Sequence, residues 1–266
     1  YIEKIQSMLQ NGEISCVELT EKYLKAIEEA NGELNAYVTV TPEVALEQAK
    51  QVDEKIKRGE KLLPLEGVPM TLKDNISTNG IETTCCSKIL KGYKPIYDAK
   101  VWEILKKNNA ILLGKTNMDE FAMGSSCETS CFGGATNPFN TDHVAGGSSG
   151  GVASAVGGDI AAFGLGSDTG GSIRQPASFC GIVGLKPTYG LVSRFGLIAF
   201  ASSLDQIGPI TKDVKDSAML LNLIAGHDEK DTTSVNLEKK DYTKSLVKDV
   251  KGLKIGLPKE FIGEGR

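Results

Sequence analysis

The segment from Gly146 to Gly190 constrains the fold more than any other part of this chain. Thirteen of its 45 residues are glycine, whereas the whole chain of 266 residues contains 30. Its Gly- and Ser-rich stretches alternate with apolar runs, Val152–Val156 and Ile160–Leu165, which are typical of a buried helix and a buried strand. A flexible Gly/Ser linker would lack such runs. The segment therefore predicts tight turns inside a folded domain, where backbone N–H groups can approach a developing negative charge.

Composition limits the classes of protein to which this chain can belong. It has 40% hydrophobic and 24% charged residues, a net charge of −4 and a pI near 5.4. This acidic balance argues against the chain alone binding a nucleic-acid backbone. The sequence shows neither a secretion signal nor an apolar run long enough for a membrane span, so we expect a cytoplasmic protein that does not contact a membrane. The six cysteines are expected to be reduced, and Cys127 and Cys131 lack the second ligand pair that a zinc site needs, so we predict no metal.

Hydrophobic periodicity predicts a single domain over residues 1–266, with a helical part at 1–60 and a catalytic core at 65–210. Ser15 and Glu18 form a capping box for a helix that runs to about Gly32, and Pro42 begins a second helix that ends near Lys57. Residues 116–126 begin as a short helix and become a polar loop. Strands are predicted at Val68–Leu72, Ala110–Leu113, Ile160–Leu165, Ile182–Leu185 and Leu253–Leu257. Further helices are predicted at Asp98–Lys107, Gly150–Val156, Ser172–Phe179 and Asp213–Ala225. This alternation indicates an α/β fold with a mixed, largely parallel central sheet covered by helices on both faces.

Candidate catalytic groups follow the predicted strands, at the sheet edge where active sites of α/β proteins lie. Ser172, in a glycine-rich turn, is the candidate nucleophile, and Lys73, at the end of an apolar strand, is the candidate base. Ser148 could pass a proton from one to the other. A lysine pKa near 10.4 must fall by about three units for this chemistry at neutral pH, which burial can cause. The two histidines, His143 and His227, could also be catalytic, although their loop positions favour surface or hydrogen-bonding roles.

Other interpretations of these residues remain open from the sequence alone. A lysine at a strand end is commonly a solvated charge, and serines flanked by glycine are commonly turn residues. A phosphate-binding loop would need the pattern Gly-x4-Gly-Lys-Ser/Thr, which the chain lacks. A nicotinamide site would need a strand, a Gly-x-Gly-x-x-Gly turn, a helix and then an acidic residue, and that combination is also missing.

Long motifs resemble those of the amidase signature family. The runs Gly146–Gly151 and Gly166–Ala177 resemble its serine motifs, and Val68–Asn75 resembles its lysine motif. Within the family, the likeness is greatest to the glutamine-hydrolysing subunits of tRNA-dependent amidotransferases. That narrower resemblance rests on Thr116–Ser125, Thr136–Pro138, Lys186–Arg194, Phe195–Pro209 and Lys254–Lys259.

The resemblance implies roles for individual residues. Ser172 corresponds to the nucleophile that forms the acyl-enzyme, Ser148 to a bridging serine in a cis peptide, and Lys73 to the base. The oxyanion hole would consist of three backbone amides, those of Thr169, Gly170 and Gly171. No cofactor or metal is implied in this chain.

The resemblance also implies an activity and partners. The partners would be the amidotransferase B and C subunits, which complete a heterotrimer. Glutamine would be hydrolysed, and its ammonia would pass to the larger partner, which uses ATP and Mg²⁺ to amidate Glu-tRNA(Gln) or Asp-tRNA(Asn) and makes most of the tRNA contacts. Because family members are longer, we expect this chain to lack a C-terminal part that holds the glutamine carboxylate and amine, and therefore to have little or no glutaminase activity alone. The alternatives are a stand-alone amidase acting on small amides and a non-catalytic scaffold protein of the complex.

Overall fold

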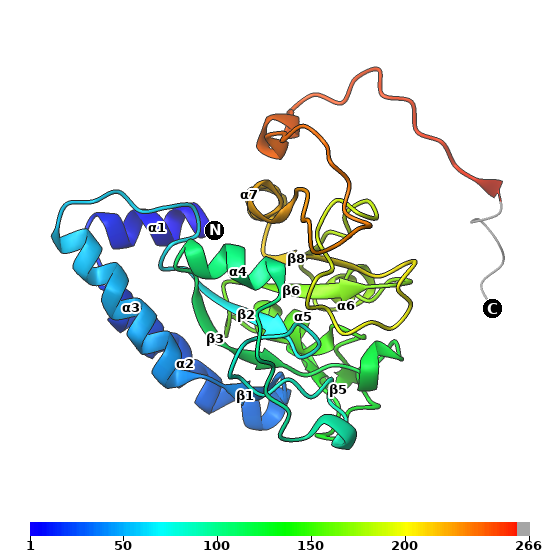
Figure 1. Ribbon diagram of the computed structural model, residues 1–266, viewed down its shortest axis with the longest axis horizontal. Coiled ribbons are helices and arrows are strands. Elements are labelled where there is room, and N and C mark those ends of the chain that lie inside the picture. Colours follow the sequence, from blue (N-terminus) through cyan, green and yellow to red (C-terminus); the bar gives the residue numbers. More distant parts are fainter. Residues whose placement is uncertain (260–266) are drawn as a thin grey trace.

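A six-stranded mixed sheet forms the centre of the computed structural model, which describes residues 1–259 (Figure 1). Strands β3, β2 and β6 pair in parallel in its middle, while β1, β8 and β7 pair antiparallel towards its two edges. The order across the sheet is β1 (Tyr37–Val40), β3 (Ile111–Thr116), β2 (Pro69–Lys73), β6 (Phe163–Asp168), β8 (Gln206–Thr211) and β7 (Val183–Gly184). The predicted mixed α/β fold is confirmed, with the parallel pairing confined to the three central strands.

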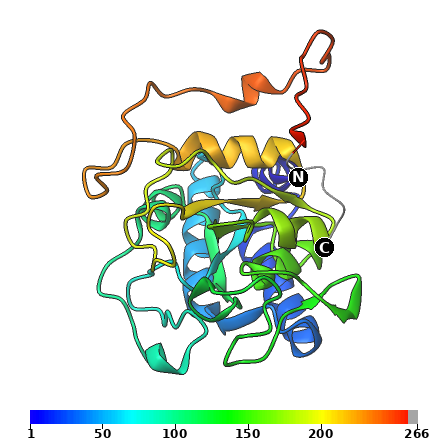
Figure 2. The same cartoon turned by 90° about the vertical axis from the view of Figure 1, so that its right-hand side faces the viewer.

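Helices cover both faces of this sheet (Figure 1). A Cβ atom at Gly164 would meet Val152 of α5 (Gly150–Gly157), and one at Gly184 would meet Ala177 of α6 (Arg174–Phe179). Gly164 and Gly184 both pair with Ile210, so α5 and α6 lie on the same face. The opposite face carries α4 (Lys100–Lys107) and α7 (Val214–Ile224), which contact each other. Figure 2 shows α7 along the outside of the domain, with the chain that follows passing over it.

Three N-terminal helices, α1 (Ile2–Gln10), α2 (Cys16–Leu34) and α3 (Pro42–Lys57), lie on one side of the domain (Figure 1). Helices α2 and α3 pack against each other and against β3, and the start of α1 is held at α7, where the N–H of Ile2 donates to Asp216. The predicted capping box is present, because the N–H of Glu18 donates to the Ser15 hydroxyl at 3.1 Å and the Glu18 carboxylate accepts from the N–H of Ser15 at 2.9 Å. Smaller elements complete the fold: β4 (Thr136–Asn137), β5 (Asn140–Val144), and the 3-10 turns η1 (Lys88–Leu90), η2 (Glu120–Ala122) and η3 (Tyr242–Ser245). No helix within residues 1–259 combines the length and the apolar character that a membrane crossing requires.

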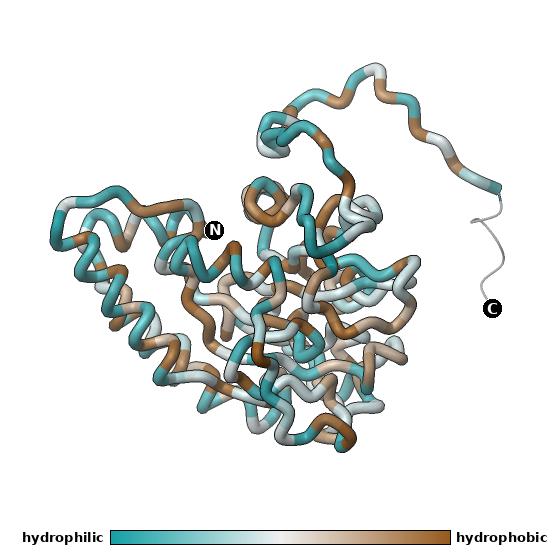
Figure 3. Tube along the Cα trace, viewed as in Figure 1, coloured by the Kyte–Doolittle hydropathy of each residue, from teal (hydrophilic) through white to brown (hydrophobic). Residues whose placement is uncertain are grey.

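Several predictions differ from the observed structure. The part predicted to be helical, residues 1–60, also contains strand β1, whose pairing with the distant β3 leaves no local signal. The segment Leu253–Leu257 forms no strand, because no other strand within residues 1–259 lies beside it to accept its backbone hydrogen bonds. Its apolar side chains, Leu253, Ile255 and Leu257, are exposed instead. Figure 3 shows this segment as part of an extended tail in which hydrophobic and hydrophilic residues alternate. Strand β6 begins at Phe163 rather than Ile160, because the N–H groups of Ile160 and Ala161 both donate to the carbonyl of Ala155 at the end of α5. The predicted short helix in residues 116–126 is one 3-10 turn, η2.

Two glycines provide a matched test of this packing. A Cβ at Gly151 of α5 would lie 2.5 Å from backbone atoms of Ala36 and Asn117, whereas one at Gly32 of α2 would meet nothing within 4 Å. We expect Gly151→Ala to lower the free energy of unfolding by about 1–3 kcal/mol through overpacking. Gly32→Ala should raise it by about 0.5–1 kcal/mol through helix propensity. Chemical denaturation of both variants measures the difference, and a Gly151→Ala protein as stable as the wild type would contradict the close approach of α5.

Candidate active site

The amine of Lys73 lies at the carboxyl end of β2, in the middle of the sheet, and is fully buried. It donates hydrogen bonds to the hydroxyl of Ser148 at 2.6 Å and to the hydroxyl of Ser167 at 2.9 Å. The carbonyl oxygen of Ser167 lies 3.3 Å from the same nitrogen. Strand alternation places Lys73 on the side of the sheet that Thr71 shares, which is the face covered by α5. The sequence prediction that Lys73 and Ser148 lie together therefore agrees with the geometry.

Burial changes the acid–base behaviour of this amine. Removal from water lowers the pKa of Lys73 from 10.5 to about 8, because a buried cation loses its hydration. Negative charge on Asp119 and Asp168 opposes this fall, whereas burial raises the pKa of Cys127 to about 11 and keeps its thiol neutral at pH 7. With a pKa of about 8, about a tenth of the amine is neutral at pH 7. That neutral fraction has a lone pair that can accept a proton from a hydroxyl.

Ser148 is positioned by groups on either side of the loop that precedes α5. The Gly147–Ser148 peptide is cis, and the N–H of Gly147 donates to Oε1 of Gln175 at 2.9 Å. The carbonyl of Ser148 accepts from the N–H of Asp119 at 3.3 Å. A Cβ at Gly147 would lie 2.1 Å from Oδ2 of Asp119, so only glycine fits at this position. Ser148 itself is fully buried, and its hydroxyl faces Lys73.

Ser172 lies in the turn after β6 and is 9% exposed. Its carbonyl accepts from the N–H of Ser149 at 3.1 Å, which brings this turn against the loop of Ser148. Among residues 1–259 the structure records no hydrogen bond from the Ser172 hydroxyl to Ser148 or to any other group. Ser172 lines a pocket of about 210 Å³ that has no charged side chain in its wall. The wall consists of Ala122, Gly124, Ser125, Gly147, Thr169, Gly170, Gly171, Ser172, Gln175 and Phe200.

The three amides predicted for the oxyanion hole differ in their availability. The N–H of Gly171 donates to Oδ1 of Asp168 at 2.8 Å, so in this structure it is already bonded. The N–H groups of Thr169 and Gly170 have no acceptor among residues 1–259, and Gly170 borders open space. This geometry favours Thr169 and Gly170 over Gly171 as donors to a bound oxyanion.

Asp168 shapes this turn, although the sequence analysis did not select it. It is fully buried at the end of β6 and accepts hydrogen bonds from the backbone of Gly171 and Ile173 and from the guanidinium of Arg174. Burial alone would raise the pKa of the Asp168 carboxyl, but the hydrogen bonds from Arg174, Ile173 and Gly171 hold it below its usual value. An aspartate at the end of a predicted strand, two residues before a Gly-Gly pair, is the sequence signal that could have identified it.

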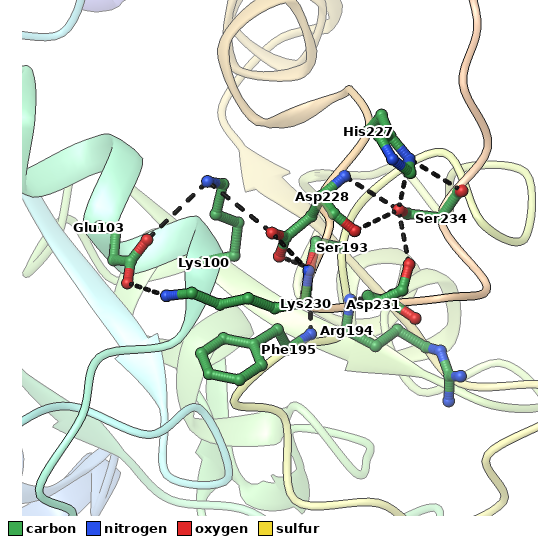
Figure 4. A network of polar contacts seen from close by, with 10 residues as sticks. All are labelled: Lys100, Glu103, Ser193, Arg194, Phe195, His227, Asp228, Lys230, Asp231 and Ser234. Atoms are coloured by element: carbon green, nitrogen blue, oxygen red, sulfur yellow. Dashed lines mark hydrogen bonds and ion pairs between the residues drawn. The ribbon is translucent and has the colours of Figure 1, made fainter.

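Neither histidine lies at this site. His143 is exposed on β5. Nδ1 of His227 lies 3.1 Å from the hydroxyl of Ser234 (Figure 4). Ser234 donates to the carbonyls of Asp228 and Asp231, so its hydroxyl serves the loop rather than a reaction. The histidines therefore have the surface and hydrogen-bonding roles that their loop positions favour.

The network around His227 also holds the chain after α7 against the rest of the domain. Ser193 donates to Asp228 at 2.6 Å, and the amine of Lys230 lies 3.2 Å from Glu103 and 4.7 Å from the ring centre of Phe195 (Figure 4).

Five of the six cysteines are buried, and within residues 1–259 no three His, Cys, Asp or Glu side chains are grouped as metal ligands would be.

Comparisons with known proteins agree with this architecture. A family model described as Amidase matches residues 18–265. The chain is 58% identical over 264 residues to the A subunit of glutamyl-tRNA(Gln) amidotransferase from Thermoanaerobacter pseudethanolicus, covering 99% of this chain and 54% of that protein. The protein of the same name from Caldanaerobacter subterraneus subsp. tengcongensis is also 58% identical, with the same coverage. The chain thus spans about half the length of the curated relatives it matches.

Solved structures show the same fold. The crystal structure of the glutamyl-tRNA(Gln) amidotransferase A subunit from Thermotoga maritima has a TM-score of 0.74 and 45% identity, covering 84% of this chain and 48% of that one. Native peptide amidase from Stenotrophomonas maltophilia has a TM-score of 0.86 and 36% identity, covering 91% of this chain and 52% of that one. With the family model matching nearly the whole sequence, the chain belongs to the amidase family.

Proposed function

We propose that this chain carries the Ser-Ser-Lys catalytic centre of the glutaminase subunit of a tRNA-dependent amidotransferase. The observation that carries the proposal is the 2.6 Å hydrogen bond between the buried amine of Lys73 and the hydroxyl of Ser148, beside the pocket that Ser172 lines. A lysine with a lowered pKa next to a hydroxyl is the arrangement expected of a general base that serves a serine nucleophile.

The chemistry follows from the order of these groups. Neutral Lys73 takes the proton of Ser148, and Ser148 takes the proton of Ser172. At the same time the Ser172 oxygen attacks the amide carbon of glutamine. The carbonyl oxygen becomes an oxyanion that the amides of Thr169 and Gly170 stabilise. The proton returns to the departing nitrogen, which leaves as ammonia. Water, deprotonated by the same route, then attacks the acyl-enzyme, releasing glutamate and restoring the Ser172 hydroxyl.

Partner proteins belong to the same proposal. The relatives at 58% identity are named as one component of an amidotransferase acting on glutamyl-tRNA(Gln), which supports a complex in which the tRNA is amidated by a second protein. ATP and Mg²⁺ would act on that second protein, and a small third one would complete the assembly. The net charge of −4 fits a division in which most of the tRNA contacts lie on a partner.

Stand-alone hydrolysis of other amides is a second candidate. The peptide amidase of Stenotrophomonas maltophilia matches this fold with a higher TM-score, 0.86, than the Thermotoga protein, 0.74. The wall of the pocket has no charged side chain within residues 1–259, so this half of the site does not itself select for the zwitterionic end of glutamine. The higher sequence identity to the amidotransferase proteins favours the first candidate.

Amidation by the full-length protein tests the choice. We expect that protein, purified with its partners, to convert Glu-tRNA(Gln) or Asp-tRNA(Asn) to the amidated form with glutamine and ATP, and to release one glutamate for each amide formed. Supplying ammonium chloride instead of glutamine bypasses Ser172 and serves as the control. Hydrolysis of peptide amides without any tRNA-linked amidation would favour the stand-alone amidase. Amidation that is driven by ammonium but never by glutamine would indicate a scaffold without a catalytic role.

A further inference from the structure

Asp205 is a buried acid that the mechanism above does not use. It lies directly before β8, and the residue is 2% exposed. Its carboxylate accepts from the N–H of Phe200 at 2.9 Å and from the N–H of Ala201 at 3.1 Å. It also accepts a very short hydrogen bond from the hydroxyl of Thr169. One carboxylate therefore joins two segments that are more than 30 residues apart in sequence.

Strand register explains why Asp205 and Thr169 meet. In the antiparallel pair of β6 and β8, Asp168 lies opposite Gln206. One step further along each strand, Thr169 leaves β6 at the point where Asp205 enters β8. Because residues opposite each other in such a pair have Cβ atoms about 5 Å apart, a threonine hydroxyl can reach an aspartate here. The register of the sheet itself thus creates the contact.

Both segments held by Asp205 form walls of the pocket at Ser172. Thr169 contributes one of the two free amides, and Phe200, which is 45% exposed, lines the same pocket. Between Thr169 and the nucleophile the chain has only Gly170 and Gly171, which have no side chains to hold them. Before Ser172, this turn is therefore attached through side chains at two points, the bond from Thr169 to Asp205 and the bond from the N–H of Gly171 to Asp168.

We propose that Asp205 is a positioning residue for amide hydrolysis at this site. By holding the hydroxyl of Thr169, it fixes the direction of the Thr169 and Gly170 amides, so that they face the oxyanion before the substrate arrives. By holding the turn that begins at Phe200, it keeps that wall of the pocket at a fixed distance from the turn of Thr169. This inference rests on the proposed function only in assuming that Ser172 forms a tetrahedral intermediate with an amide.

If Asp205 served only to close the turn before β8, its bond to Thr169 would not be needed. The hydrogen bonds to Phe200 and Ala201 are sufficient to close the turn, whose backbone is also bonded from Asp205 and Leu204 to the carbonyl of Ala201. The bond to Thr169 is additional to that turn. Its loss should weaken binding of a tetrahedral, negatively charged species more than binding of a planar one, because only the former needs aligned amide donors.

Two variants of the full-length protein with its partners test the proposal. Asp205→Asn removes the charge that makes the acceptor strong, and Thr169→Val removes one hydroxyl while keeping the shape of the side chain. We expect each to lower kcat for amide hydrolysis by about 10- to 100-fold, with KM changed by less than about threefold. Affinity for a boronic acid that becomes tetrahedral on Ser172 should fall in parallel with kcat, while affinity for the carboxylic acid product should not change. Rates are normalised to the fraction of sites that react with the boronate at saturation.

Asp53→Asn is the matched control. Asp53 on α3 also accepts backbone N–H groups, those of Cys16 and Val17, but it belongs to the N-terminal helices. The Asp53→Asn substitution should leave kcat and boronate affinity unchanged. If Asp205→Asn does not fold, Thr169→Val decides the question. Values of kcat within twofold of wild type, or equal losses of boronate and product affinity, would overturn the proposal. A wild-type protein that hydrolyses another amide but not glutamine contradicts the proposed function, and the same variants assayed on that amide or by boronate binding still decide this inference.

Discussion

Replacing Ser172 with alanine is expected to lower glutamine hydrolysis by about 10⁶-fold, the scale reached when the nucleophile of a serine hydrolase is removed. Ser172 lines the pocket, and its backbone carbonyl is hydrogen-bonded to the loop of Ser148. Without the Ser172 hydroxyl no acyl-enzyme can form, and the hydroxyl of Ser148, which is fully buried, does not replace it. Glutamate release by the full-length protein with its partners measures the loss.

Two controls separate this loss from damage to the fold. Ser154→Ala removes another buried hydroxyl, on α5, which donates to the carbonyl of Thr136 on β4. This variant should keep hydrolysis within about threefold of wild type. Amidation driven by ammonium chloride should survive in Ser172→Ala. Glutamine hydrolysis by Ser172→Ala at more than a hundredth of the wild-type rate would show that another group attacks the amide.

Replacing Lys73 with methionine is expected to lower the same rate by about 10³- to 10⁴-fold, at the upper end of what a general base contributes. Methionine fills a similar volume but accepts no proton, so Ser148 would lose the group to which its proton passes. The wild-type rate should rise as the pH increases through about 8, because only the neutral amine is a base. The residual rate of Lys73→Met should lack this step, and a variant that keeps the step or a tenth of the activity would place the base elsewhere.

Stability provides an independent check on Lys73. Its pKa is about 8 in the folded protein against 10.5 for an ordinary lysine, so between these values the unfolded chain binds more protons. The contribution of Lys73 to the free energy of unfolding, measured as the difference between the wild type and Lys73→Met, should therefore rise with pH across this window by on the order of 3 kcal/mol, and fall again as the pH drops towards 8. The buried cysteines, whose raised pKa values lower stability above pH 9, contribute to both proteins and largely cancel in this difference. Lys73→Met should be no less stable than the wild type at pH 7. Denaturation of both proteins at pH 7 and pH 10 measures both quantities.

Local signals in the sequence were sufficient for much of the fold. The capping box at Ser15 and the proline at the start of α3 mark helix ends through contacts within a few residues. Strand β8 gave no such signal, because Gly208 and Pro209 interrupt it and proline is rare inside a sheet. Pro209 cannot donate to the sheet, but it lies opposite Leu165 of β6 and its carbonyl accepts from the N–H of Leu185. Whether Leu253–Leu257 forms a strand depends on a neighbouring strand, which no local pattern specifies.

The candidate site could be predicted in part for the same reason. Ser148 and Ser172 were selected for their glycine neighbours and Lys73 for its place at the end of an apolar strand, and the structure brings Lys73 into contact with Ser148. Their catalytic roles remain predictions. The groups that hold them in place, such as Asp205 and Gln175, were missed because their significance lies in contacts across the fold. An aspartate beside a strand or a glutamine in a short helix has no distinctive pattern in a single sequence.

The proposed base and the proposed nucleophile lie on parts of the molecule with unequal stiffness. Lys73 ends a strand that is hydrogen-bonded to β3 on one side and to β6 on the other, whereas Ser172 follows two glycines in a turn. Moving the amine would require rearrangement of the central sheet, but moving the alcohol requires only small changes of backbone torsion at Gly170 and Gly171. If the proposed function holds, a partner that switches the activity on or off would therefore act most easily by shifting the turn of Ser172, leaving Lys73 in place.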